Sequence, residues 1–546
     1  MRRGVVAIVV TLTACGGNES GTEDVAREPR HRLEALLSQA PDSGVSLTLT
    51  AGDTVHVSAQ TLAYYRRVRF RPAWLDGSQV SERGRGVHAV LRGAEQDGLA
   101  PARYRLETAT RLLGMLSAED AAEALDAGAR AGYLADIDLL LSEGYMRYAT
   151  DIVTGTIDPE QVGRAWRVHR DAPPTELVLR SAVRGDPAQI VQRLRPATPN
   201  YGRLMRALAR LREVQAAGGW PALPAGIKAA EGDSSAAVGA LRARLAASDD
   251  AREAMLARQG AAQAAKYDRD LRDALRHFQT RHGLDDDGKL GGMTLVELQH
   301  PVEERIAEVR LNLDRWRWLP RELGDLFVLV NIAGFELEVV ENNRTIEAMN
   351  VVVGKIGNET PVFADTMEHV VVNPYWNVPT SILKEEILPA IARDPGYLAR
   401  NNMEWVGDGG VRQRPGRDNA LGKVKFLFPN SNNIYLHDTP ADHLFARARR
   451  DFSHGCIRVE RPLDLARLIV SKATNHSPSS LQAMLNTTTE KWINLKRPIP
   501  VYITYFTAWV GEDGTLRFHH DIYGHDVELL DTEGETRAER VARVGG

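Results

Sequence analysis

A cysteine and a histidine in the C-terminal part of the chain have the residue types of a thiol nucleophile and its base. Cys456 follows the turn 453–455 (Ser-His-Gly), and His437 lies nineteen residues upstream. A thiol attacks as its thiolate, and a neighbouring imidazole lowers the pKa of the thiol, which is ~8.5 in a free cysteine. A cysteine and a histidine that folding brings together therefore predict acyl transfer through a thioester.

The same residues also fit interpretations in which neither side chain takes part in a reaction. Free cysteines are among the most buried residues, so Cys456 could fill a core, with His437 as an ordinary strand histidine. The polar turn 453–455 and Arg458 argue against a core position. A metal site is not favoured either, because a single thiolate lacks the close ligand spacing of a Cys-x-x-Cys motif. We expect a nucleophile without metal or other cofactor, and Gly455 leaves backbone amides near the sulfur accessible for an oxyanion hole.

The region that must position this pair has the pattern of a β-rich domain. Between residues 326 and 506, short β-type runs alternate with Gly, Asn and Pro, which indicates a sandwich-like or barrel-like sheet. One such run ends at His437. Residues 377–411 are helical and irregular instead, and a long insertion of this kind is often a lid. The other predicted strands are 327–332, 335–340, 348–353 and 368–373.

The whole chain predicts a multidomain α+β protein. Its 546 residues are enough for about three or four domains. Three histidines near the end, His519, His520 and His525, do not predict a metal site because they lack a matching ligand pattern. The predicted boundaries are 28–217 for a mostly helical scaffold, 218–231 for a linker, 232–300 for a small three-helix module with an insertion, 301–325 for a connecting helix, 326–506 for the β-rich domain and 507–546 for a tail.

The N-terminus has the pattern of an export signal. Arg2 and Arg3 precede the apolar run 5–12, which is too short to span a bilayer. The sequence that ends at Cys15 resembles a bacterial lipobox, so we expect a signal peptide 1–15, lipidation of Cys15 and a flexible tether 16–27. The alternative is an ordinary signal peptide with an incidental cysteine.

The cysteine count and the charge add two expectations. The chain has two cysteines, so a lipidated Cys15 leaves Cys456 without a disulfide partner, and a lone exported thiol is a liability unless it is used. The net charge of -4 and the pI near 6.5 do not indicate a nucleic-acid partner. We expect a lipid-anchored protein on the periplasmic face of the bacterial envelope, at the outer membrane.

The residues around Cys456 resemble the signature of the L,D-transpeptidase (YkuD-type) family, in which a histidine precedes Ser/Thr-His-Gly-Cys. Here fifteen residues separate His437 from Ser453. Arg458 is a departure, because many members have Asn there. The module 232–300 resembles a peptidoglycan-binding module, with the order helix, Phe-Gln, Gly-Leu turn, Asp-Gly turn, Gly-x-x-Thr, helix. Further blocks match the larger periplasmic members: 373–379, 412–416, 419–426, 429–430 and 434–440.

The resemblance implies that Cys456 attacks the third residue, of the diaminopimelate type, in a tetrapeptide stem and releases the terminal D-alanine. The amine of a neighbouring stem would then resolve the thioester into a 3→3 cross-link, with His437 as general base. The N–H groups of Gly455 and Cys456 would hold the oxyanion, while Ser453 and His454 would orient the pair and shape the site.

The same resemblance implies a set of substrate contacts. Arg458 would bind a stem carboxylate, for which a surface or structural ion pair is the alternative. The other expected substrate-binding residues are Trp376, Arg412 and Tyr435. A carbapenem would acylate the cysteine as a mimic of the donor stem.

Two other functions fit the sequence. Water could resolve the thioester, which would make the protein an L,D-carboxypeptidase or endopeptidase, although a lid that excludes water favours aminolysis. Alternatively, the protein could be a non-catalytic lipoprotein that tethers the membrane to peptidoglycan, for which the module 232–300 and Cys15 suffice.

Overall fold

The computed structural model describes residues 28–117, 125–159, 166–167, 173–248, 265–407 and 409–534. The predicted signal peptide with Cys15, the tether and most of the module's insertion lie outside these residues. The chain divides into two compact units. One comprises 1–156, 170–197 and 316–321, and the other comprises 157–169, 198–315 and 322–546.

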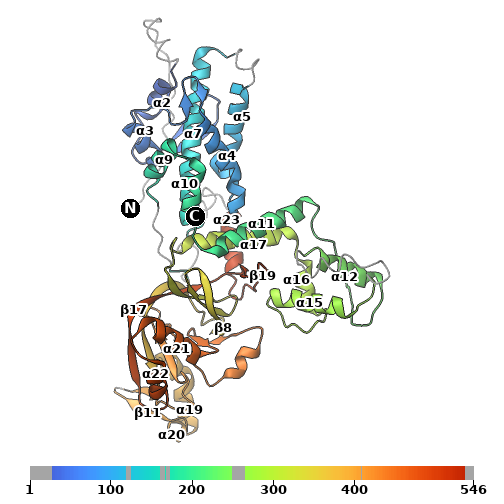
Figure 1. The fold of residues 1–546 in the computed structure, drawn as a ribbon, viewed down its shortest axis with the longest axis vertical. Helices are drawn as coiled ribbons and strands as arrows, with labels where there is room; N and C mark the ends of the chain where they lie inside the picture. Colours follow the sequence, from blue (N-terminus) through green and yellow to red (C-terminus); the bar gives the residue numbers. More distant parts are fainter. Residues whose placement is uncertain are drawn as a thin grey trace. The chain divides into compact units, whose positions relative to one another are not determined.

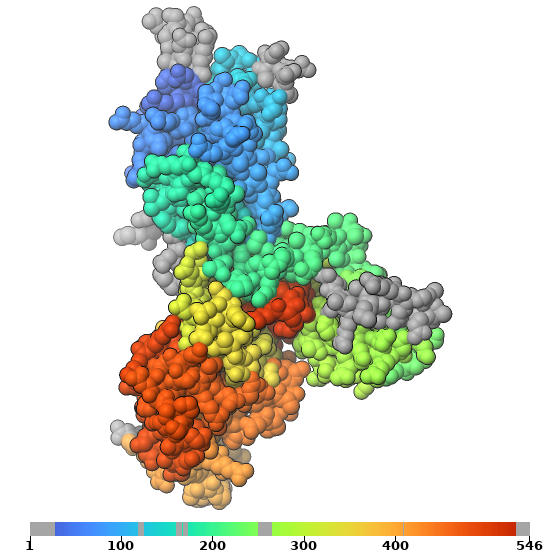
Figure 2. Space-filling model, viewed as in Figure 1, coloured from blue at the N-terminus to red at the C-terminus, as the bar shows by residue number. Residues whose placement is uncertain are grey.

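The first unit is a helical body built around α7 (Ala127–Thr154), which is buried along most of its length (Figure 1). Asp126 caps the start of this helix by accepting a hydrogen bond from the Ala129 N–H. The other helices close over the same core, so the space-filling view shows their outer side chains in blue and teal (Figure 2). The remaining elements are α2 (Pro29–Leu37), α3 (Ala59–Arg67), α4 (Glu82–Arg92), η1 (Gly93–Asp97), η2 (Pro101–Tyr104), α5 (Leu106–Ser117), α9 (Thr175–Arg184) and α10 (Pro187–Leu194), with the hairpins β1 (Val45–Thr48)/β2 (Thr54–Val57) and β3 (Leu75–Asp76)/β4 (Gln79–Val80).

A buried carboxylate organises this core. Asp138 accepts hydrogen bonds from the Tyr65 hydroxyl at 2.6 Å and from the Trp74 N–H at 2.7 Å. Burial raises the pKa of Asp138 to about 6, although these hydrogen bonds oppose the shift. The residue therefore ties three segments of the scaffold together, which is a structural task.

The second unit begins with a helical part: α11 (Pro199–Ala216), α12 (Ala236–Ala246), α15 (Arg269–Arg281), α16 (Gly292–Gln299) and α17 (Val302–Trp318). The motif residues of the three-helix module form a hydrogen-bond network. The Gln279 amide donates to Asp287 at 3.0 Å and to Thr294 at 3.1 Å, and its oxygen accepts from the Gly288 N–H at 2.8 Å. The Phe-Gln, Asp-Gly and Gly-x-x-Thr pattern therefore holds the module together.

The β-rich part of this unit is a sheet that closes on itself. The strands follow the order β13-β14-β16-β8-β7-β6-β17-β9, and β13 pairs with β9 as well as with β14. Closure pairs both edges, which would otherwise expose N–H and C=O groups. The strands are β6 (Leu326–Asn331), β7 (Glu336–Glu341), β8 (Arg344–Gly354), β9 (Val362–Val372), β13 (Val424–Leu427), β14 (Leu436–His437), β16 (Ile457–Val459) and β17 (Lys491–Thr504); β5 (Trp166–Arg167) adds to β9, and β15 (Asp451–Ser453) adds to β8.

The predicted insertion has a small core of its own, formed by Leu383, Ile387 and Val411 with partly buried apolar neighbours. Its elements are β10 (Trp376–Asn377), α18 (Thr380–Ile382), the π-helical turn η3 (Leu383–Ile387), α19 (Leu388–Arg393), α20 (Tyr397–Arg400), β11 (Met403–Val406) and β12 (Gly410–Gln413). The rest of the unit comprises η4 (Asp442–Ala446), α21 (Pro462–Ala473), α22 (Pro478–Leu485), the hairpin β18 (Ala508–Val510)/β19 (Leu516–Phe518) and α23 (His525–Gly534).

The predicted fold class is confirmed: a helical N-terminal region with a small helical module precedes a β-rich domain that carries a helical insertion. Within the described ranges, no helix combines the length and the apolar character needed to cross a bilayer.

Candidate active site

The strand register brings four polar side chains to one face of the sheet. β14 runs parallel to β16, with Leu436 opposite Ile457 and His437 opposite Arg458. Leu436 and Ile457 are fully buried in the core. Because side chains alternate along a strand, His437 and Arg458 point to the opposite face. Tyr435 and Cys456, two residues earlier on each chain segment, share that face.

The imidazole of His437 is held in one tautomer. Its Nδ1 lies 2.5 Å from the backbone carbonyl oxygen of Asp438. A carbonyl can only accept, so Nδ1 carries the proton and Nε2 keeps its lone pair. Burial, aided by the charges of Arg458 and Lys425, lowers the pKa of His437 to about 3. The ring is therefore neutral at physiological pH and can accept a proton at Nε2.

Cys456 is half-buried, and its Sγ lies 3.8 Å from the Asn433 carbonyl oxygen. Burial raises the pKa of the thiol, while hydrogen bonds from Tyr435 and the charge of Arg458 oppose this shift. No hydrogen bond joins Cys456 to His437 in the described part of the chain. In this structure the pair is thus a neutral thiol and a neutral imidazole, and hydrogen bonds between a nucleophile and its base often tighten only when substrate binds.

The turn before Cys456 is clamped by Ser453. Its hydroxyl donates to the Cys456 carbonyl at 2.6 Å and accepts from the Gly455 N–H at 3.1 Å. Gly455 has φ +110°, a conformation that other residues rarely adopt. The Gly455 N–H thus already donates to the Ser453 hydroxyl, and its expected contact with the oxyanion stays a prediction. The Cys456 N–H makes no hydrogen bond to any described residue and is thus a donor without a partner among them.

The His454 side chain contacts the insertion. Its Nε2 lies 2.9 Å from Glu386 Oε1, on the π-helical turn η3 of the insertion. The expected role of His454 in orienting the Cys456–His437 pair and shaping the site stays a prediction. The residue connects the turn before Cys456 to the insertion, a contact between distant segments that sequence spacing cannot reveal.

Arg458 is partly buried beside the thiol, and its Nε has no hydrogen-bond partner. Burial lowers the pKa of this guanidinium, and the adjacent Cys456 opposes that shift. No carboxylate among the described residues forms an ion pair with it. The alternative of a structural ion pair is thus not observed, and the unneutralised cation is available for an anionic ligand.

Two other predicted substrate-binding residues are placed in the insertion. Arg412 donates to Glu404 at 2.6 Å and stacks on the Tyr375 ring, 4.3 Å from its centroid. Its guanidinium is therefore engaged locally, and the expected contact with substrate stays a prediction. Trp376 is half-buried in β10, where it pairs with Gln413 of β12.

Asp438 is a site residue that the sequence analysis did not single out, although it belongs to a matching block. Besides its carbonyl contact with His437, its carboxylate accepts from the Lys423 N–H at 2.7 Å and from the Thr439 N–H at 2.6 Å. Gly422, with φ +55°, leaves the space that this carboxylate occupies. The site thus depends on a backbone carbonyl, which no residue-type pattern identifies. Among the described residues, no group of three or more His, Cys, Asp or Glu side chains is arranged to hold a metal.

Comparison with known families identifies the domains. Residues 325–501 match a model described as "L,D-transpeptidase catalytic domain" (YkuD), residues 59–208 match "Scaffold domain", and residues 234–298 match "Putative peptidoglycan binding domain". The β-rich domain with Cys456 and His437 is therefore an L,D-transpeptidase catalytic domain of the YkuD family, and the resemblance found in the sequence is confirmed.

Individual relatives carry the same description. The chain is 33% identical over 244 residues to a Haemophilus influenzae protein named "Putative L,D-transpeptidase", a match that covers 41% of this chain and 48% of that protein, so about half of the relative's length is spanned. Similar solved structures include an L,D-transpeptidase from Mycobacterium smegmatis (13% identity, 33% of this chain and 58% of that chain, TM-score 0.18) and one from Xylanimonas cellulosilytica (16%, 51% and 98%, TM-score 0.15). At these TM-scores the structural likenesses carry no argument.

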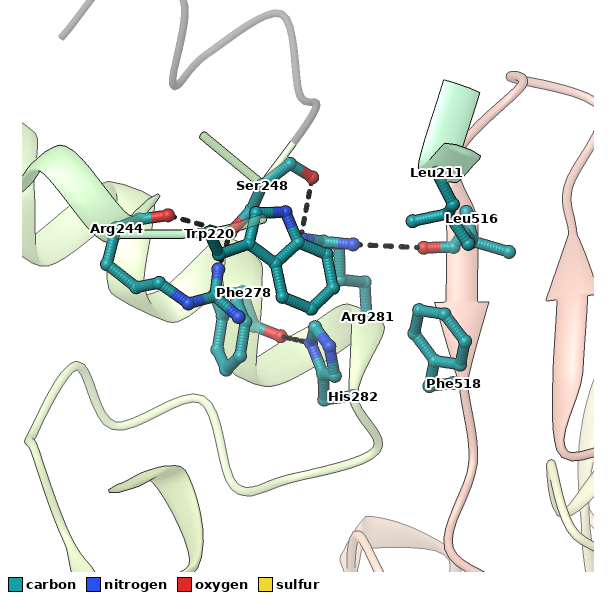
Figure 3. A pocket seen from close by; sticks show the side chains of 9 residues that line it. All are labelled: Leu211, Trp220, Arg244, Ser248, Phe278, Arg281, His282, Leu516 and Phe518. Carbon is teal, nitrogen blue, oxygen red and sulfur yellow. Dashed lines mark hydrogen bonds between the residues drawn. The ribbon is translucent and has the colours of Figure 1, made fainter. Parts of the chain in front are cut away.

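The peptidoglycan-binding module borders a small cavity of about 20 Å³ (Figure 3). The Arg244 guanidinium lies 4.1 Å from the centroid of the Trp220 ring and donates to the Ser248 hydroxyl. A volume of this size holds about one water molecule, so this cavity is not a groove for a glycan or a peptide. Its lining consists of Leu211, Trp220, Arg244, Ser248, Phe278, Arg281, His282, Leu516 and Phe518.

Proposed function

We propose that this chain is an L,D-transpeptidase that forms 3→3 cross-links between peptidoglycan stems through a thioester on Cys456. The observation that carries the proposal is the shared face of Cys456, His437 and Arg458, on which a thiol, an unprotonated imidazole nitrogen and an unneutralised guanidinium lie together. Nucleophile, base and anion-binding group are what acyl transfer from an anionic peptide requires. The YkuD match supports the same class of reaction.

In the first half-reaction, Cys456 Sγ attacks the carbonyl carbon of the third stem residue. The Sγ–C bond forms and the peptide C–N bond breaks. The thiol proton passes through His437 Nε2 to the departing amine of the terminal D-alanine. The oxyanion that develops accepts a hydrogen bond from the Cys456 N–H, and Arg458 binds a carboxylate of the donor stem.

In the second half-reaction, the side-chain amine of an acceptor stem attacks the thioester carbon. The new C–N bond forms, the C–Sγ bond breaks, and His437 transfers the amine proton to the departing sulfur. The half-buried position of Cys456 and the insertion beside its turn favour an amine over bulk water, because partial closure limits hydrolysis.

Incubation of the full-length protein with disaccharide-tetrapeptides, followed by mass spectrometry, tests this function. We expect cross-linked dimers and released D-alanine, and no product from Cys456→Ala. Tripeptides without dimers would replace the proposal by an L,D-carboxypeptidase. Absence of any Cys456-dependent product would contradict both enzymes and leave a peptidoglycan tether.

We also propose that the protein acts at the periplasmic face of the envelope, lipid-anchored through Cys15, with the peptidoglycan-binding module holding it at the wall. The lipobox-like sequence and the module match support this location. Labelling of cells with a clickable fatty acid should mark the wild-type protein and not Cys15→Ala. Equal labelling of both would contradict lipidation at this residue.

A further inference from the structure

A loop outside the catalytic motif holds the peptide bond that precedes the nucleophile. The Thr360 hydroxyl, in the loop between β8 and β9, donates to the Gly455 carbonyl oxygen at 2.7 Å. The same hydroxyl accepts from the Gly354 N–H at 2.9 Å. Thr360 is fully buried, so both of its hydrogen-bonding functions are satisfied inside the protein and its rotamer is determined.

This contact determines where the oxyanion donor points. The Gly455 carbonyl and the Cys456 N–H belong to one planar trans peptide, in which C=O and N–H point in opposite directions. A hydrogen bond that holds the carbonyl therefore also orients the N–H. Since the Gly455 N–H is occupied by Ser453, the Cys456 N–H is the donor of this turn that has no partner among the described residues, and its direction depends on Thr360.

The loop itself is held by a residue beyond the end of the matched catalytic domain. The Tyr523 hydroxyl donates to the Gly354 carbonyl at 2.5 Å and accepts from the Thr360 N–H at 3.3 Å. The Tyr523 N–H donates in turn to the Tyr505 hydroxyl at 3.0 Å. The loop also packs closely at Gly354, where an added Cβ would collide with the backbone of Asn358 and Thr360.

We propose that Thr360 is a positioning residue that aims the Cys456 N–H at the developing oxyanion, and that Tyr523 holds Thr360 in place. The inference rests on the proposed acyl-transfer function. It assigns a task in the reaction to Tyr523, which lies in the predicted tail 507–546. Neither residue touches the sulfur, so both act through the geometry of the turn.

Two reactions of Cys456 Sγ are compared in order to test this positioning role. The comparison separates it from a general effect on folding or on the reactivity of the thiol. Acylation by the carbapenem imipenem forms an Sγ–C bond, opens the ring C–N bond and moves the thiol proton to the ring nitrogen, and its transition state carries an oxyanion. Alkylation by iodoacetamide forms an Sγ–CH2 bond with loss of iodide and a proton, and it develops no oxyanion. The ratio of the two rates therefore separates an effect on the oxyanion-forming reaction from an effect on the reactivity of the thiol.

We expect Thr360→Val to slow acylation of the full-length protein about tenfold or more, since loss of one oxyanion donor costs about 10²–10³. Alkylation should stay within about twofold of wild type. Thr360→Ser, which keeps the hydroxyl, should restore most of the acylation rate. Tyr523→Phe should slow acylation by about threefold, because the Thr360 contact is loosened and not removed. Intact-protein mass spectrometry measures both rates.

Two controls remove comparable hydroxyl-to-carbonyl bonds elsewhere. Thr474 donates to the Val470 carbonyl at 2.7 Å, and the Tyr502 hydroxyl donates to the Leu323 carbonyl at 3.1 Å. Thr474→Val and Tyr502→Phe should leave the acylation-to-alkylation ratio unchanged. An unchanged ratio in Thr360→Val, or equal slowing of both reactions, would overturn the inference. A wild-type protein that is alkylated but never acylated would overturn the proposed function, and the inference with it.

Discussion

His454 Nε2 and Glu386 Oε1 lie 2.9 Å apart, and this contact joins the turn of the nucleophile to the π-helical turn of the insertion. The two segments are far apart in the sequence, and both side chains are partly accessible to solvent. The contact therefore places the insertion beside the turn that precedes Cys456, and it contributes little free energy to that arrangement. A lid that opens for substrate requires a connection of this modest strength.

Removal of the Glu386 charge should loosen the insertion. Partly exposed pairs contribute about 0.2–1 kcal/mol, so Glu386→Gln should raise the rate of Cys456 alkylation by about two- to fivefold with little change in melting temperature. Mass spectrometry of samples in which alkylation is quenched at successive times measures this rate. The matched control is Glu385→Gln, which removes the same charge from an exposed neighbouring residue. Equal acceleration in both variants would show that the contact does not hold the insertion.

The stability of the catalytic domain should fall as the pH drops, in part because of His437. Its pKa is about 3 in the folded protein, below the value of 6.5 for an unperturbed histidine. Between these values the unfolded state binds more protons, so this stabilisation is fully present above pH 6.5 and is lost as the pH falls towards 3. His437→Gln should reduce the slope of unfolding free energy against pH between 4 and 6 by up to about 1.4 kcal/mol per pH unit.

Denaturant unfolding at several pH values tests this expectation. His443→Gln, which changes an exposed histidine, serves as the control. Identical slopes in wild type and His437→Gln would show that the imidazole is not buried in its neutral form. In that case the assignment of Nε2 as a ready proton acceptor would also fail.

Arg458 should matter more for anionic donors than for the reactivity of the thiol. A hydrogen bond to a charged group contributes about 1.5–3 kcal/mol, so Arg458→Gln should raise the KM for a tetrapeptide donor by about 10- to 100-fold. Arg458→Lys should recover only part of this loss, because a lysine cannot bind a carboxylate bidentately. Arg412→Gln is the comparison, since that guanidinium is engaged by Glu404. Steady-state kinetics that show equal KM values for the three variants and wild type would contradict a carboxylate contact at Arg458.

The sequence predicted the fold class because it depends on local patterns, and the roles of Cys456 and His437 stay predictions. Alternation of apolar residues identified strands that the structure contains, and the turn before Cys456 has the short-range signature of its family. The remaining details depend on contacts that such patterns do not encode. Thr360 lies 95 residues from Gly455 in the sequence, and Glu386 reaches His454 from the insertion.

The direction of individual hydrogen bonds was likewise inaccessible from residue types. The residue type of Gly455 does not indicate the partner of its N–H, which the structure shows to be the Ser453 hydroxyl. Arg412 and Arg458 are the same residue type, yet Arg412 is paired with Glu404 and Arg458 has no carboxylate partner among the described residues. Burial and pairing therefore decide which arginine can bind substrate, and both are tertiary properties.

Gly422 should be essential for the geometry of the site, because its lack of a side chain leaves room for the Asp438 carboxylate. It has φ +55°, and an added Cβ would collide with the Asp438 carboxyl group. Displacement of Asp438 would also move the carbonyl that holds His437 Nδ1. Gly77 has a similar φ of +58° with nothing within 4 Å, so Gly77→Ala isolates the cost of the backbone conformation.

Gly77→Ala should therefore destabilise the protein by about 1–2 kcal/mol, the usual cost of a left-handed conformation for a residue with a Cβ, without an effect on catalysis. Gly422→Ala should cost more, by about 1–3 kcal/mol, because a collision adds to the strain. It should also slow acylation of Cys456 about tenfold or more, since the imidazole loses its orienting partner. Chemical denaturation and imipenem acylation measure the two effects. Acylation at the wild-type rate in Gly422→Ala would mean that the Asp438 carbonyl is not what holds His437 in its reactive tautomer.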